Sequence, residues 1–373
     1  MKRLTKILAS AALLAAVVLS NVNTGLAQGG PDQQPDRAID AATRTQVIEA
    51  ILKRLKDSYI FPEKAAETEK AIRARQQNKE YDSVTSAREF ARKLTEDLQA
   101  VSRDKHMNVH YFHRGTPPDE RPEPTAEDRE RFRQFAGRIN FGFERVERLP
   151  GNVGYMDFRG FIDPELGADT VAASFNFLAN TDALIIDLRR NGGGDPAMVA
   201  LICSYLFGPE PVHLNDLHWR EGNRTEEYWT RKEVAGRRYA KDVYVLTSNR
   251  TFSGAEEFSY NLKNLKRATI VGETTGGGAH PGRGVRLSEH FGMFLPTGRA
   301  ISPITKTNWE GTGVEPDVKV PADQALKTAH LAALRKGAEK VTDPQLKGEF
   351  QRQIETLQKE LGEMQSRVSE NKK

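Results

Sequence analysis

Residues 243–266 read VYVLTSNRTFSGAEEFSYNLKNLK, and the hydrophobic period of this stretch changes at one serine. The opening VYVLT is mostly β-branched or aromatic, which is typical of a buried strand. After Gly254, apolar residues recur at steps of three and four, which describes one face of a helix. These residues are Ala255, Phe258, Leu262 and Leu265. Ser253 is therefore predicted to lie on a turn between a strand and a helix.

A serine in this position has two interpretations. As a nucleophile, it would have an exposed hydroxyl on a rigid corner and a helix N-terminus whose free N–H groups stabilise negative charge. As a helix cap, Ser253 would only accept a hydrogen bond from the helix, and Glu256 would complete a capping box. Because caps far outnumber nucleophiles, this stretch alone favours the cap, and the rest of the chain must decide.

The composition is that of an ordinary globular protein of about two domains. The chain has 373 residues, of which 38% are hydrophobic and 28% charged, and its formal net charge is +4. The charges are spread along the sequence without a basic stripe, so no nucleic-acid partner is expected. Cys203 is the only cysteine, which excludes a disulfide within the chain and a thiolate metal cluster.

The N-terminus has the three parts of a secretory signal peptide. Lys2, Arg3 and Lys6 precede an apolar run over residues 7–19, and small residues end at Ala27. The run is shorter than the roughly 20 residues of a spanning helix, which disfavours an uncleaved membrane anchor. We expect cleavage of residues 1–27, a disordered spacer over 28–37, and export of a mature chain without a membrane span to the periplasm or the medium.

Helical and strand patterns follow in separate parts of the chain. Helical spacing over 43–59 and 86–98 predicts a small N-terminal helical domain at 38–115, and a proline-rich acidic stretch predicts a surface loop and linker at 116–140. From 141 to 322, short β-rich runs alternate with helical patterns, which indicates an α/β layered domain. Strands are expected at 141–146, 153–158, 183–188, 243–247 and 269–272, helices at 168–178 and 196–206, and hairpin strands at 284–289, 292–295 and 299–301.

The C-terminal helical tail, residues 323–373, carries a short heptad pattern. Its apolar residues recur at steps of four and three, as in a coiled-coil seam. They are Leu346, Phe350, Ile354, Leu357, Leu361, Met364 and Val368. The pattern predicts either a homo-oligomer formed through this seam or a helix folded back on its own domain, and Gly362 favours the second because it interrupts the heptads.

A second strand-turn-helix pattern carries three consecutive glycines. The apolar run ALIIDLRR leads into Asn191-Gly-Gly-Gly194, and Pro196 stands in the first turn of the following helix. Glycines in such a loop can aim bare N–H groups at an anion or an oxyanion, although a triple glycine is more often only a tight turn.

Three histidines are the candidate metal ligands. His106, His110 and His113 lie in an alternating pattern that predicts a strand, which would place His113 on the opposite face from the other two. The sequence also lacks a His-Glu-x-x-His motif. We therefore expect no metal and no cofactor, and we expect one of these histidines to act as a base.

Four ordered motifs resemble the C-terminal processing, or tail-specific, serine peptidases, in the branch that includes the tricorn core and the interphotoreceptor retinoid-binding protein. The motifs are DLRRNGGG at 187–194, TFSGAEEF at 251–258, VGETTGGGA at 271–279 and GTGVEPDVKV at 311–320, and residues 140–161 are similar to the retinoid-binding branch. The resemblance implies a crotonase-like or Clp-like ββα catalytic domain preceded by a small helical domain. It also implies Ser253 as nucleophile and the amides of Gly193 and Gly254 as oxyanion hole.

The chain departs from the bacterial processing peptidases in two ways. Gly278 stands where those enzymes carry a lysine base, and there is no room for their PDZ domain. The tricorn-like branch instead uses an N-terminal histidine and a glutamate before its Gly-Val-x-Pro-Asp motif, which His106 and Glu310 match. Lys105 stands where that branch has a serine, so the resemblance leaves open how the base is oriented and whether Lys105 assists or replaces it.

The sequence predicts an exported serine endopeptidase that cleaves polypeptides through an acyl-enzyme on Ser253, with His106 as base and Glu310 as its orienting carboxylate. The resemblance and the β-rich surroundings also predict that the substrate binds as an added β-strand. The alternative is a non-catalytic binding protein for an apolar, retinoid-like or fatty-acid-like ligand with a vestigial site. An enzyme acting on acyl-coenzyme A is disfavoured because no basic cluster for the adenine side is visible.

Overall fold

The computed structural model describes residues 35–116 and 125–370, with side chains up to residue 366. The signal peptide predicted at 1–27, residues 28–34 of the predicted spacer and the side chain of Val368 lie outside what is described. The chain divides into two compact units, and each unit gathers segments that are distant in sequence. Unit 1 comprises residues up to Phe132 with 216–226 and 278–301, and unit 2 comprises 133–215, 227–277 and the residues from Ser302 onward.

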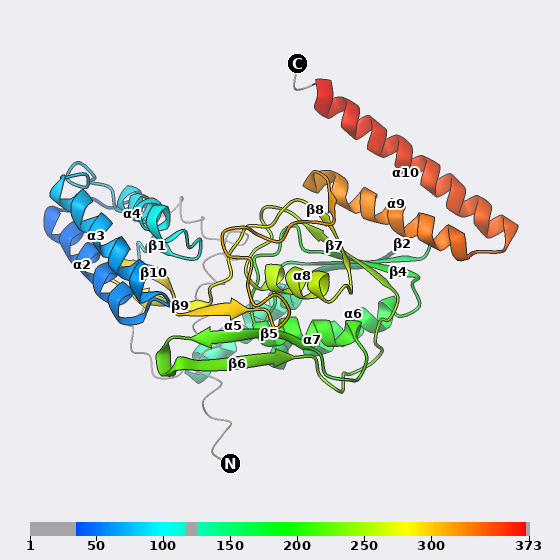
Figure 1. Cartoon of the computed structure of the whole chain (residues 1–373), viewed down its shortest axis with the longest axis horizontal. Coiled ribbons are helices and arrows are strands. Elements are labelled where there is room, and N and C mark those ends of the chain that lie inside the picture. Colours follow the sequence, from blue (N-terminus) through cyan, green and yellow to red (C-terminus); the bar gives the residue numbers. More distant parts are fainter. Residues whose placement is uncertain (1–34, 117–124, 371–373) are drawn as a thin grey trace, which may run out of the picture. The chain divides into compact units, whose positions relative to one another are not determined.

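A six-stranded sheet forms the centre of unit 2 (Figure 1). Its strand order is β12 (Val318–Lys319), β8 (Thr269–Gly272), β7 (Asp242–Thr247), β4 (Ala183–Asp187), β3 (Val153–Phe158) and β2 (Phe143–Leu149). Neighbouring strands are parallel except for β2, which is antiparallel to β3. The central strands β4 and β7 are continuous apolar runs because parallel strands in the middle of a sheet are buried on both faces.

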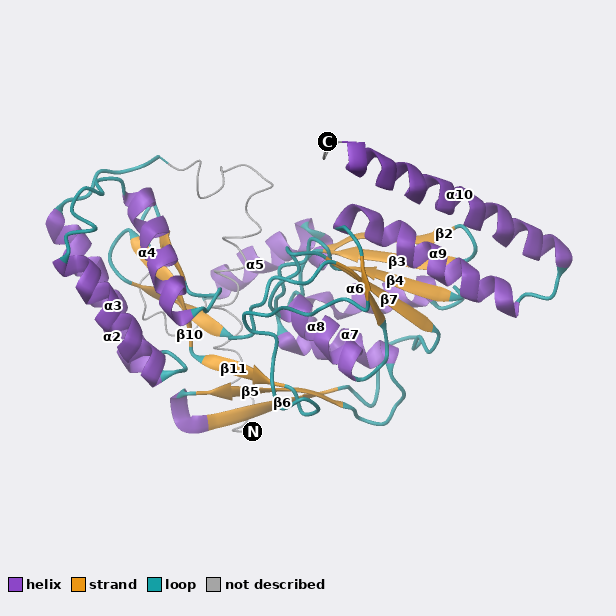
Figure 2. Ribbon diagram, turned by 45° about the horizontal axis from the view of Figure 1, so that its top comes forward, coloured by secondary structure: helices purple, strands orange, loops and turns teal. Residues whose placement is uncertain are grey.

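Alternate residues of these strands face two different cores. Ile186 and Val245 pack against α6 (Pro164–Leu178), α7 (Pro196–Leu206) and α8 (Gly254–Asn264). Ile185 and Leu246 pack on the other face against α9 (Ala322–Lys340) and α10 (Pro344–Glu370). Figure 2 shows the sheet between these two groups of helices. The α/β layered fold class predicted from the sequence is thus confirmed.

Unit 1 packs three helices against a three-stranded antiparallel sheet. The helices are α2 (Ala41–Ser58), α3 (Pro62–Gln77) and α4 (Ala87–Ser102), and the strand order is β1 (Asn108–Tyr111), β10 (Phe291–Pro296) and β9 (Gly282–Arg286). Asp40 and Ser86 begin α2 and α4 by accepting helix N–H groups at 2.8 and 3.1 Å. Phe90 of α4 meets Phe291 of β10 edge to face, with ring centroids 6.0 Å apart.

The division into units differs from the predicted domains. The helices of the predicted N-terminal domain share one core with Val285, Met293 and Leu295, which come from the hairpin assigned by sequence to the catalytic domain. A sequence-contiguous domain at 38–115 would therefore leave part of its apolar face uncovered. The predicted linker at 116–140 also contains α5 (Ala126–Arg138), whose weak amphipathic pattern buries only Ala136.

A second small sheet was not foreseen in full. It has the order β11 (Gly298–Ile301), β5 (His213–Trp219) and β6 (Arg224–Trp229), of which the sequence predicted only β11. Polar residues occupy most positions of β6, so the strand lacks the apolar alternation by which strands are recognised. Within unit 1, β11 runs antiparallel to the end of β5, from Gly298 opposite Trp219 to Ile301 opposite Asp216.

The heptad residues of the tail pack against the helix that precedes them. Phe350 and Ile354 are buried in the core that α10 shares with α9 and the sheet, and Leu357 and Leu361 pack at its margin. A Cβ added to Gly337 of α9 would lie 2.8 Å from the Phe350 ring, so glycine permits this close approach. This packing is what the fold-back alternative expects, whereas a homo-oligomer remains a prediction.

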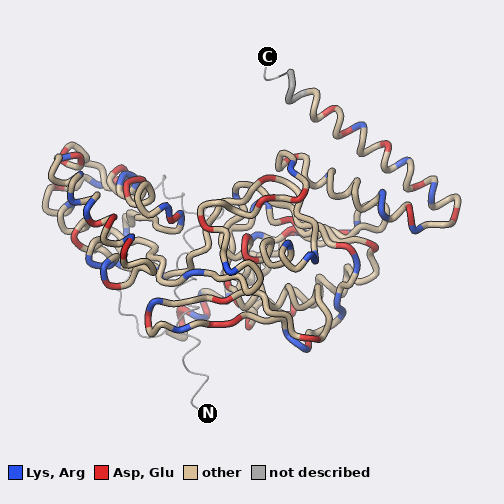
Figure 3. The backbone as a smooth tube through the Cα atoms, in the orientation of Figure 1, with Lys and Arg blue, Asp and Glu red and all other residues tan. Residues whose placement is uncertain are grey.

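The described part of the chain contains no helix of the length and apolar character that a bilayer crossing requires. Figure 3 shows basic and acidic residues interspersed along the described backbone of both units.

Candidate active site

Ser253 connects strand β7 to helix α8 with a strained backbone. Its φ and ψ are 53° and −121°, whereas a serine that only caps a helix ordinarily has β-region angles. Positive φ is uncommon for residues other than glycine, and such strain concentrates at functional sites. The backbone therefore matches the sharp strand-to-helix turn that presents a nucleophile better than it matches a simple cap.

The glycine loop after β4 packs directly against this serine turn. Gly193 has a φ of +100°, and a Cβ added to it would lie 2.6 Å from Gly254 N and 2.8 Å from Ser253 Cβ. Two hydrogen bonds join the loops, from Phe252 N–H to the Asn191 carbonyl at 3.1 Å and from Thr251 Oγ1 to the Leu188 carbonyl at 2.8 Å. The site thus lies at the carboxyl ends of adjacent parallel strands, where α/β sheets bind their ligands.

The two amides predicted for the oxyanion hole are neighbours, but they are in different states. Gly254 is the first residue of α8, and its N–H is one of the unsatisfied amides at a helix start. The Gly193 N–H donates to Asn191 Oδ1 at 2.8 Å. Asn191 is fully buried and donates in turn to the Phe158 carbonyl at 3.0 Å. An oxyanion must therefore share the Gly193 amide with Asn191, a partner that the sequence prediction missed.

Glu256 fixes the turn from inside the protein. Its carboxylate is fully buried and accepts from Ser253 N–H at 2.9 Å, Thr275 Oγ1 at 2.5 Å and Gly277 N–H at 2.6 Å. The first of these bonds is the glutamate half of the predicted capping box. The other two bring the glycine-rich loop after β8 to the start of α8, so Glu256 does more than cap a helix.

The same network reaches the segment that carries Glu310. Val314 N–H donates to Thr275 Oγ1 at 2.7 Å, and Gly311 N–H donates to the Gly277 carbonyl at 3.0 Å. Residues 311–314 are therefore bonded to the loop that Glu256 holds. Glu310 itself is half-buried, and its N–H donates to Asn308 Oδ1 at 2.9 Å. Within unit 2, Ser253 and the loop of Glu310 are thus joined through one carboxylate.

His106 belongs to unit 1, on the turn between α4 and β1. Arg103 ends α4 in the left-handed conformation, with a φ of 59°, and the chain reverses before Met107. The imidazole lies against the Phe294 ring, with centroids 5.6 Å apart. Burial lowers the pKa of His106 to about 4, opposed by the charge of Asp104 and reinforced by His280. The ring is therefore neutral at pH 7, as a proton acceptor must be.

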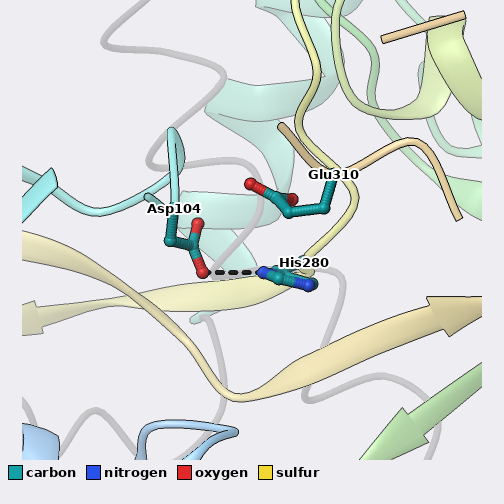
Figure 4. A group of neighbouring side chains, drawn as sticks. All are labelled: Asp104, His280 and Glu310. Carbon is teal, nitrogen blue, oxygen red and sulfur yellow. Dashed lines mark hydrogen bonds and ion pairs between the residues drawn. The ribbon is translucent and has the colours of Figure 1, made fainter. Parts of the chain in front are cut away.

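Asp104 and His280 form a buried pair that the sequence analysis missed (Figure 4). His280 Nδ1 lies 2.8 Å from Asp104 Oδ2, and the two side chains are 8% and 1% exposed. Asp104 Oδ1 also accepts the His106 N–H at 3.1 Å, an arrangement typical of an aspartate two residues before its partner. The spacing Asp-x-His was a signal for this turn, whereas no local pattern connects residue 104 to residue 280.

The other candidate histidines and Lys105 lie close to His106 along the chain. His110 lies on β1, where burial lowers the pKa of its ring, and His113 follows that strand. The Lys105 side chain is exposed on the same turn as His106. The predicted catalytic residues are thus distributed between the two units, with Ser253, Gly193, Gly254 and Glu310 in unit 2 and His106 in unit 1.

A strained serine at a helix N-terminus, packed against a glycine loop at the carboxyl edge of a parallel sheet, is an arrangement typical of serine hydrolases on α/β folds. Residues 152–320 match the model of peptidase family S41, and residues 41–143 match the N-terminal domain of peptidase S41 in eukaryotic IRBP. The chain belongs to peptidase family S41 and is a serine-type peptidase.

Solved structures with TM-scores above 0.5 share this fold at low sequence identity. A candidate peptidase from Parabacteroides merdae superimposes with a TM-score of 0.57 at 17% identity, over 80% of this chain and 99% of that one. A lipoprotein from Streptococcus agalactiae gives 0.52 at 15% identity, over 79% and 96%. The photosystem II D1 C-terminal processing protease gives 0.45 at 15% identity, over 76% and 94%.

Proposed function

We propose that this chain is an exported endopeptidase that hydrolyses peptide bonds through an acyl-enzyme on Ser253. The observation that carries the proposal is the backbone of Ser253, whose angles of 53° and −121° hold the residue in a strained turn against the Gly193 loop. A structural cap has no need of that strain, whereas a nucleophile gains an exposed hydroxyl beside the N-terminus of α8.

In the proposed mechanism, His106 takes the proton of the Ser253 hydroxyl while the oxygen attacks the substrate carbonyl. The Gly254 N–H, together with the Gly193 N–H, donates to the resulting oxyanion. The tetrahedral intermediate collapses, the peptide C–N bond breaks, and His106 returns the proton to the leaving amine. Water then hydrolyses the ester by the same steps. Glu310 holds the imidazole in the required tautomer and stabilises its protonated form.

The half-buried position of His106 supports its role as base and not as a surface cation. Its ring is neutral at pH 7 because burial lowers its pKa to about 4. This value is lower than the ideal for a base that works near pH 7, so substrate binding or Glu310 must raise it for efficient proton transfer. The proposed substrate is a polypeptide bound as an added β-strand, since main-chain hydrogen bonds give broad sequence tolerance.

Labelling with a fluorophosphonate tests the nucleophile directly. The wild-type chain should become labelled at Ser253, and Ser253→Ala should not, with both proteins melting at similar temperatures. Incubation of the same pair with a peptide library should give cleavage only for the wild type. A wild-type chain that neither labels nor cleaves would favour the apolar-ligand binding protein, which binding of retinol or a fatty acid would then test.

Export is a separate part of the proposal. It rests on the N-terminal pattern of basic, apolar and small residues over 1–27. N-terminal sequencing of the protein from the periplasm or the medium should begin near Gln28, whereas a retained Met1 in a membrane fraction would contradict it.

A further inference from the structure

One buried carboxylate in unit 1 receives three hydrogen bonds from three different parts of the chain. Asp104 accepts from His106 N–H at 3.1 Å, from Tyr59 Oη at 3.2 Å and from His280 Nδ1 at 2.8 Å. Both Asp104 and His280 are buried. An aspartate that only shaped the turn would need only the hydrogen bond from the His106 N–H. The additional hydrogen bonds from Tyr59 and His280 therefore indicate a further role for Asp104.

We propose that Asp104 and His280 form a positioning pair that fixes the orientation and the proton affinity of His106. The inference rests on the proposed function, in which His106 is the base. It assigns a role to two residues that the Ser253, His106 and Glu310 mechanism does not use, and it answers how the base is held although Lys105 replaces the preceding serine.

The orientation of His106 follows from the hydrogen bonds that fix the turn between α4 and β1. Asp104 Oδ1 binds the His106 N–H, and the Asp104 carbonyl accepts the Met107 N–H at 3.2 Å, so the residues on both sides of the His106 Cα are fixed. Met107 is fully buried, and the Phe294 ring limits the imidazole on one side. Tyr59 and His280 then prevent the Asp104 carboxylate from rotating away, because Oδ2 is bonded to both.

The proton affinity of His106 follows from the charges of its neighbours Asp104 and His280. A negative charge on Asp104 favours the protonated form of His106, whereas the nearby His280 disfavours it. Asp104 and His280 therefore act on the proton affinity of His106 in opposite directions. Within unit 1, the surrounding elements also carry Tyr59 at the end of α2, Lys105 on the turn, Arg299 over the Phe61 ring that contacts His280, and Arg220, which donates to the Tyr59 carbonyl.

Two substitutions should therefore move the titration of His106 in opposite directions. His280→Gln removes the opposing imidazole but keeps a side-chain amide that can donate to Asp104, so His106 should titrate at a higher pH. Asp104→Asn removes the favourable charge, so His106 should titrate at a lower pH. Each displacement of the His106 titration midpoint should be about one pH unit, the lower end of what a neighbouring charge produces. A purely structural pair would not give shifts of opposite sign.

The experiment is an NMR titration of the full mature chain with 15N-labelled histidine, in the Ser253→Ala background. This readout needs no turnover, so it tests the pair even if the proposed peptidase activity is absent, and fluorophosphonate labelling tests that activity separately. Tyr59→Phe is the matched control, because it removes one hydrogen bond to Asp104 without changing a charge. It should leave the His106 midpoint within a few tenths of a pH unit.

We expect the titration midpoint of His106 to rise in His280→Gln, to fall in Asp104→Asn and to stay unchanged in Tyr59→Phe. Equal midpoints in all four proteins, or displacements of the same sign, would overturn the inference. Should Asp104→Asn fail to fold, the upward displacement in His280→Gln alone decides. In the active protein, the acid limb of kcat/KM against pH should move with the NMR midpoint for His280→Gln, and an unmoved limb would contradict the link to catalysis.

Discussion

Substitution of Glu256 by glutamine should damage both stability and reactivity at Ser253. The carboxylate accepts three hydrogen bonds in a fully buried position, one through Oε2 and two through Oε1. An amide has only one acceptor oxygen, so its NH2 group must face a donor on one side, either Ser253 N–H or Gly277 N–H. At least one hydrogen bond to a charged group is therefore lost.

The expected cost is about 1.5–3 kcal/mol in the free energy of unfolding, the range for one hydrogen bond to a charged partner. If the same free energy is lost from the geometry of the Ser253 turn, the rate of fluorophosphonate labelling should fall about 10- to 150-fold. Urea unfolding measures the first quantity, and the time course of labelling at saturating probe measures the second. Thr275→Val, which removes one donor of the same network, should cost less in both.

Glu257→Gln is the matched control, because it makes the same chemical change at the next residue of α8. Burial raises the pKa of Glu257 to about 8, so this side chain is neutral at pH 6 and glutamine replaces it without loss of charge. The control should label at the wild-type rate at pH 6. A Glu256→Gln protein that unfolds and labels like wild type would refute the claim that this carboxylate holds the nucleophile in place.

Three further outcomes are expected. The pKa of Glu257 is about 8 in the folded protein and 4.5 ordinarily, so this group's contribution to the free energy of unfolding should fall by about 5 kcal/mol as pH rises from about 4.5 to 8. Urea unfolding at pH 5 and 9 should show this decline in the wild type and not in Glu257→Gln, and a parallel decline in the variant would contradict the prediction. Gly193→Ala should abolish labelling, since its Cβ would lie 2.6 Å from Gly254 N, whereas Gly192→Ala, with open space around its Cβ, should label normally. Phe350→Ala should lower the free energy of unfolding by about 3–5 kcal/mol without changing the oligomer size in light scattering; a change in size would instead support assembly through the heptads.

The spacing of apolar residues and the residues that form turns and helix caps were sufficient to predict many elements of unit 2 from the sequence. The strand at 153–158 and the helix at 196–206 were predicted with the bounds that the structure has, because β3 is bounded by turn residues and α7 by Asp195 and Pro196. The serine turn was placed correctly for the same reason, since a change of period marks a strand-to-helix boundary. The sequence stretch alone could not decide whether Ser253 is a cap or a nucleophile, because both roles need the same residue types.

The parts that sequence reasoning missed depend on long-range contacts. The hairpin β9–β10 has the polarity of a surface ribbon at Arg283 and Arg286, yet Val285 and Met293 complete the core of helices that begin some 200 residues earlier. A hydrophobic period says which face of an element is buried, but it does not say against which partner. The predicted boundary near residue 141 followed the change from helical to strand patterns, whereas the compact units follow the cores.

The same limit explains why Asp104 and His280 escaped notice. Asp104 stands two residues before the candidate base, and His280 directly follows the third motif, residues 271–279. Neither segment shows on its own that its residue will be buried, because a buried carboxylate is costly unless partners from elsewhere satisfy it. The hairpin that returns to the N-terminal helices supplies that partner in His280. The discontinuity of this compact unit is therefore also what creates the pair. In the proposed pair, the proton affinity of His106 depends on a residue 174 positions away along the chain (280 − 106).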